Sequence, residues 1–88
     1  MPQAVVDPEE VRQFARLLKK FTNDLRDRMT VVNNQLTALG ATWRDQEHRK
    51  FVDRFDDHAK HLVRFLEENE VHVRYLVKKA DQIDEYLA

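Results

Sequence analysis

Apolar residues recur every three or four positions along most of this chain. In the first half they fall at Val11, Phe14, Leu18, Phe21 and Leu25. This spacing is that of a helix that packs against another helix. After Leu25 the pattern slips by one four-residue step to Met29, which is typical of a stutter that locally unwinds a coiled coil. The spacing predicts a first helix over residues 8–39.

Both ends of this predicted helix carry a signal. Asp7 is a good N-cap, and Pro8 suits the first helical position. Gly40, the only glycine of the chain, comes directly after the last apolar position. A glycine in the left-handed conformation ends many helices at this point. We therefore expect the chain to turn at residues 40–42.

A second helix is predicted over residues 43–87. Thr42, with Asp45 three residues later, has the spacing of a helix start. The apolar seam of this helix consists of Trp43, Phe51, Phe55, Ala59, Leu62, Leu66, Val73, Leu76, Ala80, Ile83 and Leu87. Because short connections join antiparallel helices, the predicted fold class is all-α, a single antiparallel two-helix hairpin.

The apolar stripes are wider than one hairpin interface needs, since Leu17 and Val31 extend the first stripe and Val63 and Phe65 extend the second. Cores this small rarely supply more than about 3–5 kcal/mol, and the chain has no cysteine for a disulfide. We therefore expect two hairpins to pair into a four-helix bundle, with the longer second helix overhanging at its C-terminal end. The residues predicted for the hairpin or dimer seam are Phe14, Leu18, Phe21, Leu25, Phe55, Leu62, Leu66, Asn69 and Leu76.

Asn69 occupies a seam position between Leu66 and Val73, where an aliphatic residue is expected. Two interpretations remain open at this point. A buried asparagine fixes the register and the number of partners at some cost in stability. Alternatively, Asn69 lies at the edge of the seam and faces water.

Charge and composition exclude several classes of function. The 15 basic and 16 acidic residues are interleaved and give a net charge of −1, so there is no basic stripe for nucleic acid. No apolar run approaches the roughly 20 residues that cross a bilayer. The N-terminus lacks a cationic region followed by an apolar one, so no cleaved signal peptide is expected. We expect a protein that stays in the cytoplasm or is exported without a cleaved leader.

The sequence offers no constellation for catalysis or metal binding. The four histidines, His48, His58, His61 and His72, lack the paired Glu-x-x-His motifs of metal-binding bundles, so we interpret them as solvated and paired with nearby acids. Serine is absent, and there is no glycine-rich phosphate loop. No catalytic, cofactor-binding or metal-binding residue is predicted, and the chain is not expected to be an enzyme.

The predicted turn contains Trp43, and Phe51 follows it eight residues later. With the length of the chain and its two long helices, this turn resembles the WXG family, the small helical-hairpin proteins exported by bacterial type VII secretion systems. The chain departs from the family pattern at two points. Asp45 stands at the glycine position, and Lys79 follows Tyr75 where the Tyr-x-x-x-Asp/Glu tail signal of many members has an acid.

The resemblance implies a secreted, non-catalytic protein without a cofactor that acts as a homodimer, or as a heterodimer with a paralogue. It also suggests that Trp43, Asp45 and Phe51 form a turn surface that contacts the secretion machinery, with a secretion ATPase as one candidate partner. A purely structural interpretation, in which the aromatic residues form the core at the turn, stands beside this one. The competing function is that of a cytoplasmic dimeric helical adaptor with no role in secretion.

Overall fold

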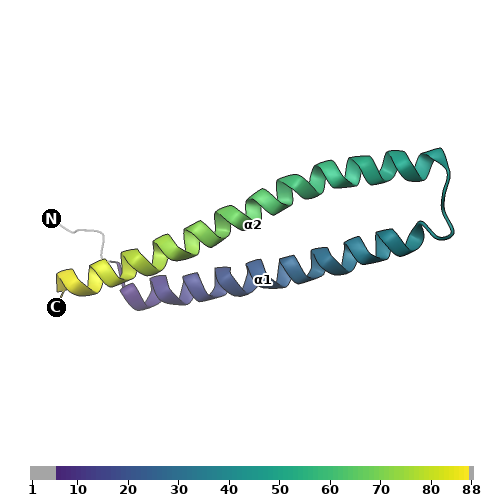
Figure 1. Ribbon diagram of the computed structural model, residues 1–88. Helices are drawn as coiled ribbons and strands as arrows, with labels where there is room; N and C mark the ends of the chain where they lie inside the picture. The colour runs from purple at the N-terminus through teal and green to yellow at the C-terminus, as the bar shows by residue number, and fades with distance from the viewer. Residues whose placement is uncertain (1–5, 88) are drawn as a thin grey trace.

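The computed structural model describes residues 6–87, which form two α-helices (Figure 1). Helix α1 spans Pro8–Leu39 and helix α2 spans Gln46–Leu87. The helices lie side by side in opposite directions and are joined at one end, so that the molecule is a rod of 65 × 20 × 17 Å. The predicted all-α antiparallel hairpin is confirmed.

The bounds of α1 are those that the sequence predicts. The carboxylate of Asp7 accepts a hydrogen bond from the amide of Glu9 at 2.9 Å, which satisfies one of the free donors at the helix start. At the other end, the left-handed conformation expected of Gly40 is wrong, because its φ of −61° and ψ of −16° are right-handed. The amides of residues 40–42 each donate to the carbonyl three positions earlier, which holds the chain in a right-handed turn.

The start of α2 differs from the prediction by three residues. Asp45 caps this helix, since its carboxylate accepts a hydrogen bond from the amide of His48 at 3.0 Å. Thr42, which the sequence suggested as the N-cap, instead donates its hydroxyl to the last carbonyl of α1 at 3.4 Å. The connection therefore covers residues 40–45 rather than 40–42, and Trp43 lies in the loop instead of in the helix.

The two helices pack along a heptad seam. On α1 its least exposed members are Val11, Ala15, Leu18, Thr22, Leu25, Met29 and Leu36. On α2 they are Val52, Phe55, Ala59, Leu62, Leu66, Asn69, Val73, Leu76, Ala80 and Ile83. The spacing alternates between four and three residues, apart from the exposed Val32, so the stutter expected after Leu25 is wrong.

Phe14 and Phe21 lie beside this intrahairpin seam, not on it. Their exposed fractions are 53% and 48%, whereas Ala15 and Thr22, one position later in each case, are 2% and 1% exposed. The other residues predicted for the seam lie on it: Leu18, Leu25, Phe55, Leu62, Leu66, Asn69 and Leu76. The register of α1 is therefore rotated by one position from the one that the apolar pattern suggested.

Small residues set the distance between the helices. The most buried side chains in the described part of the chain are Ala15, Thr22, Leu66, Asn69 and Ala80. All of them lie at the middle of the rod or toward the end with the termini, where Figure 1 shows the helices closest together. Because the separation of packed helices depends on the side chains at the contact, the larger residues nearer the turn hold the helices further apart.

Asn69 is buried, with 5% of its surface exposed, so the interpretation in which it faces water is wrong. Its Nδ2 atom has no hydrogen-bond partner among the described residues. Thr22, also buried, donates its hydroxyl to the carbonyl of Leu18 at 2.7 Å. The centre of the seam is therefore polar, and its unpaired amide destabilises the hairpin relative to an apolar contact.

Ion pairs fix the helices along one edge of the contact. Arg12 donates to Asp81 at 2.9 Å and also to Asp84, and the bonds to these carboxylates raise the pKa of Arg12 further above its usual value. Arg26 pairs with Glu70 in the same way. The pairs of Arg12 with Asp81 and Asp84 place the last turns of α2 beside the start of α1, so the expected C-terminal overhang is wrong.

Ala15→Leu should destabilise the hairpin, because the larger side chain meets α2 where the helices are closest. Overpacking of this kind costs about 1–3 kcal/mol, which urea unfolding followed by far-UV circular dichroism would measure. Ala38→Leu is the matched control, since Ala38 is exposed on the same helix and its substitution should change stability by less than about 0.5 kcal/mol. Equal effects of the two substitutions would contradict the close contact at Ala15.

Candidate functional site

A cluster of aromatic rings occupies the turn end of the hairpin. The ring of Trp43 meets that of His48 edge-on, with 5.0 Å between centroids, and lies 6.1 Å from Phe51. Phe51 in turn stacks on Phe55 at 6.1 Å. The amide of Trp43 donates to the carbonyl of Leu39 at 2.9 Å, which holds the loop against the end of α1. The loop and the first turns of α2 therefore form one packed unit.

Gly40 is explained by close packing and not by backbone conformation. A Cβ at this position would lie 3.2 Å from the carbonyl oxygen of Thr37 and 3.5 Å from Cε1 of His48. The imidazole of His48 thus fills the space beside Gly40 and contacts Trp43 on another side. Its Nε2 atom is buried and has no partner in the part of the chain that the structure describes. The glycine and the tryptophan are close in sequence because His48 packs against both.

A recess opens beside Trp43 on the outer surface of this turn end. Its lining consists of Trp43, Glu47, Lys50, Phe51 and Arg54. Two of these residues are aromatic and two are cationic. The carboxylate oxygen Oε1 of Glu47 lies 3.7 Å from Nζ of Lys50. An aromatic surface next to cations suits a partner that offers an apolar side chain beside an acidic group.

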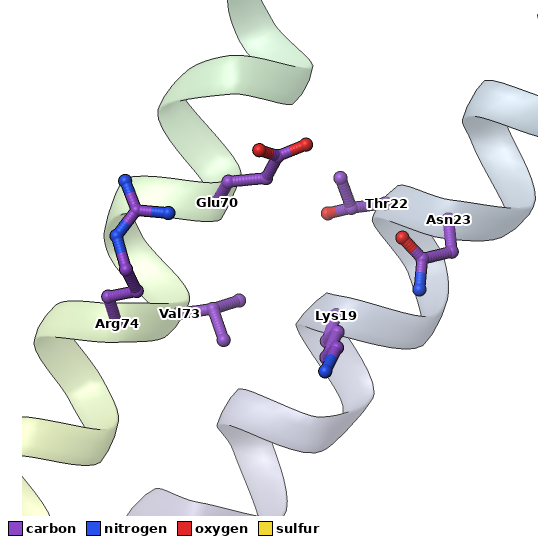
Figure 2. Close-up of a pocket in the computed structure, with 6 residues that line it drawn as sticks. All are labelled: Lys19, Thr22, Asn23, Glu70, Val73 and Arg74. Carbon is purple, nitrogen blue, oxygen red and sulfur yellow. The ribbon is translucent and has the colours of Figure 1, made fainter.

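One long side of the rod, which we call the charged flank, consists of Arg12, Lys19, Arg26, Glu70 and Asp84. On α1 these positions are seven residues apart, and the pairs of Arg12 and Arg26 described above cross to α2 on this side. Figure 2 shows the middle of the charged flank, where Lys19 and Thr22 lie across a recess from Glu70 and Val73. Charged side chains therefore cover the hairpin contact here.

The opposite side has a different chemistry. Arg28 of α1 and His58 of α2 belong to the lining of an open groove on this side. The other members of the lining are mostly apolar: Leu25, Met29, Val32, Asn33, Phe55, Ala59 and Leu62. The hairpin contact is thus open to solvent on this side and is not covered by ion pairs.

Large apolar side chains continue this side toward the middle and open end of the rod. Seven-residue steps stay on one side of a coiled coil, so Phe14 and Phe21 share the side of Arg28, and Phe65 shares that of His58. Leu17 lies between the first two on the surface of α1. Their exposed fractions run from 44% for Phe65 to 62% for Leu17. We call the set of Phe14, Leu17, Phe21 and Phe65 the aromatic flank, and exposed apolar patches of this kind mark interaction sites.

The three residues that the sequence suggested for the turn surface do come together at one end of the rod. Trp43 is half-buried and Phe51 is 46% exposed, so both rings are accessible in part. Asp45 has a structural role there, since its carboxylate caps α2. His48 was interpreted as solvated, and this is wrong. The signal for its packing was its place four residues before Val52 in the seam of α2.

Two other kinds of site are a metal cluster and a membrane-spanning helix. Within residues 6–87 no group of three or more His, Cys, Asp or Glu side chains could hold a metal ion. Over the same residues, neither helix combines the length and the apolar character that crossing a membrane requires. Large apolar side chains are exposed or half-buried at two places, the turn with Trp43 and Phe51 and the aromatic flank.

Asp45→Ala should destabilise the start of α2, because the amide of His48 loses its acceptor. Loss of an N-cap costs about 0.5–2 kcal/mol, and the Trp43 fluorescence should shift as the loop loosens. Asp53→Ala is the control, since Asp53 is exposed in the interior of α2. Its removal should change stability by less than about 0.5 kcal/mol. An Asp45 variant as stable as this control would exclude the capping role.

Comparison with known proteins agrees with the geometry of the hairpin. Residues 3–86 match the WXG100 family model, described as proteins of 100 residues with WXG. No curated protein and no solved structure gives a significant match. The family match covers both helices and the loop that joins them. With a tryptophan at the turn of a long helical hairpin, the chain belongs to the WXG100 family.

Proposed function

We propose that this chain is a secreted component of a bacterial type VII secretion system that acts as a dimer. The observation that carries the proposal is the family match over residues 3–86, because the WXG100 family comprises small helical proteins of these systems. The chain would fold in the cytoplasm and leave without a cleaved signal peptide. The role is non-catalytic and requires no cofactor.

The exposed aromatic flank supports the dimer. Phe14, Phe21 and Phe65 each leave 44% or more of their surface in water. Burial of this apolar surface against a partner would stabilise the complex by roughly 25 cal/mol per Å². A partner hairpin on this flank would remove these rings from water and complete a four-helix bundle. The partner is either another copy or a paralogue of the same shape.

The turn supports a contact with the secretion machinery. The loop that carries Trp43 lies at the end of the rod, so a partner on a long flank leaves this end accessible. Trp43, Lys50 and Arg54 line the recess there. The tail signal of many family members is incomplete here, since Lys79 occupies the acidic position. We therefore propose the turn as the surface that the machinery recognises, with a secretion ATPase as the candidate partner.

The departure at Lys79 also favours a second candidate function. A protein with this hairpin and with Lys79 four residues after Tyr75 would remain in the cytoplasm as a dimeric helical adaptor. The aromatic flank would then serve the same dimer, while the turn would bind a cytoplasmic protein. The two functions differ in one measurable respect, which is the appearance of the chain outside intact cells.

Trp43→Ala should abolish export, because it removes the ring at the centre of the turn surface. The measurement is the amount of the chain in culture medium, with a cytoplasmic marker that reports lysis. Circular dichroism and light scattering should show unchanged helicity and mass, since the hairpin seam does not include Trp43. Tyr86→Ala is the matched control, because Tyr86 is an aromatic residue 88% exposed at the far end of the rod.

Each other outcome has a defined meaning. Export of the Trp43 variant at the level of the control would remove the turn from the proposed function. Loss of helicity or of the dimer in that variant would assign Trp43 to core packing. Retention of the unsubstituted chain inside the cells, with the secretion system active, would favour the cytoplasmic adaptor.

A further inference from the structure

We propose that the charged flank binds a helix of a different protein through an acidic side chain. That side chain lies in the recess shown in Figure 2, between Lys19 of α1 and Arg74 of α2. An aliphatic side chain one heptad away on the same helix lies in a second recess of this flank. The inference goes beyond the proposed function, because it concerns the side of the rod opposite the aromatic flank and requires neither export nor a dimer.

The ion pairs of the charged flank leave one position open. Arg12 of α1 bonds to Asp84 of α2. Fourteen residues further along α1, Arg26 pairs with Glu70, which lies fourteen residues before Asp84. The halfway position on α1 is Lys19, which makes no ion pair with any of the described residues. The row of pairs therefore has a gap at Lys19.

Val77 occupies the position on α2 where an acid would close this gap. It lies halfway between Glu70 and Asp84, so in an antiparallel hairpin it is level with Lys19. Its side chain is apolar and 41% exposed, so it does not neutralise the ammonium group. The lysine is therefore available to a carboxylate from another molecule.

The recess beside the gap suits a single carboxylate. Its volume is about 280 Å³, which is smaller than the roughly 300–1,000 Å³ of sites that enclose a drug-sized ligand. Lys19 and Asn23 line it from α1, and Arg74 lines it from α2. Within residues 6–87, Arg74 also makes no ion pair. Ammonium, guanidinium and amide groups all donate hydrogen bonds to a carboxylate, whereas Glu70, the acid of the lining, is already bonded to Arg26.

A second recess repeats the first one heptad closer to the turn. Its lining consists of Arg26, Met29, Thr30, Asn33, Val63, Leu66 and Glu67. Apart from Asn33, each of these residues is seven positions from a residue of the first recess, later on α1 and earlier on α2. Met29, Val63 and Leu66 make the second recess mostly apolar. Seven residues of a helix rise about 10.5 Å, so a helix along the flank brings an acid to one recess and an aliphatic residue to the other.

This chain is a poor source of such a helix. Its helical acids with an aliphatic residue one heptad away on both sides are Asp24 and Glu70. Asp24 already bonds to Lys20 at 3.0 Å, and Glu70 pairs with Arg26. A second copy would have to break one of these pairs to offer its carboxylate. The partner is therefore a different protein, and a contact of a few helical turns is the size of a transient interface.

A synthetic helix tests the contact directly. The probe is an alanine-based helical peptide with one glutamate between two leucines, each one heptad away, so that it fits in either direction along the flank. The matched peptide has glutamine in place of glutamate. NMR titration of the unsubstituted chain should show the largest amide shifts at Lys19, Asn23 and Arg74. The glutamate peptide should bind about threefold more tightly than the glutamine peptide, as expected for a partly exposed ion pair, and 1 M salt should remove this preference.

Matched variants locate the carboxylate. Lys19→Gln should abolish the preference for the glutamate peptide, whereas Lys20→Gln removes the same charge from the next position and should retain it. Val77→Glu should also abolish the preference, because the new carboxylate is level with Lys19 and pairs with it inside the hairpin. Asn34→Glu is its control, since it adds the same charge at an exposed position of α1 outside both recesses. Circular dichroism should show all four variants folded.

The other outcomes are equally definite. Equal binding of the two peptides, or no shift at Lys19 with millimolar peptide, overturns the inference. Inorganic phosphate that shifts the same amides as strongly as the glutamate peptide would make the recess a general anion site and overturn the helical partner. A light-scattering mass of the chain alone that falls on Lys19→Gln would assign the flank to self-association. Failure in any of these tests leaves the proposed function in place, and a chain that is never exported leaves this contact in place.

Discussion

The close contact of small residues along α1 and α2 determines the rest of this structure. Ala15 and Ala80 are almost completely buried, and they allow the two backbones to approach where no larger side chain would fit. The ion pairs of Arg12 and Arg26 then form on one edge of this contact. Once this register is set, the larger rings of Phe14 and Phe21 are excluded from the contact and must lie on the other edge.

The number, direction and approximate ends of the helices follow from the sequence, because periodicity and capping are local. The register of the seam does not. Phe14 lies four residues before Leu18 and Ala15 lies three residues before it, and both spacings suit a helix seam. An interpretation that ranks residues by hydrophobicity therefore selects the phenylalanine over the alanine. At the close contact between the two long helices, however, the size of the side chain decides, and the smaller alanine is the one that is buried. The apolar residues of α1 belong to two surfaces, the seam with α2 and the aromatic flank. The spacing of apolar residues alone does not show which residue belongs to which surface.

The candidate site shows the same division between local and spatial information. The separation of Trp43 and Phe51 is visible in the sequence, and the structure brings both rings to the turn. The sequence places His48 at a seam position, four residues before Val52, but it does not reveal the contacts of this side chain, which depend on where the loop places the ring of Trp43 and the backbone of Gly40. The role of Asp45 also depends on the structure. With a helix start at residue 43 it would lie in the first turn, whereas with the observed start at Gln46 it caps the helix.

The two flanks and the turn impose a definite geometry on any assembly. The charged flank carries the ion pairs of Arg12 and Arg26, whereas the aromatic flank exposes large apolar side chains, so a partner gains most by covering the aromatic flank. A partner there leaves the turn free, because the turn is at the end of the rod and not on its side.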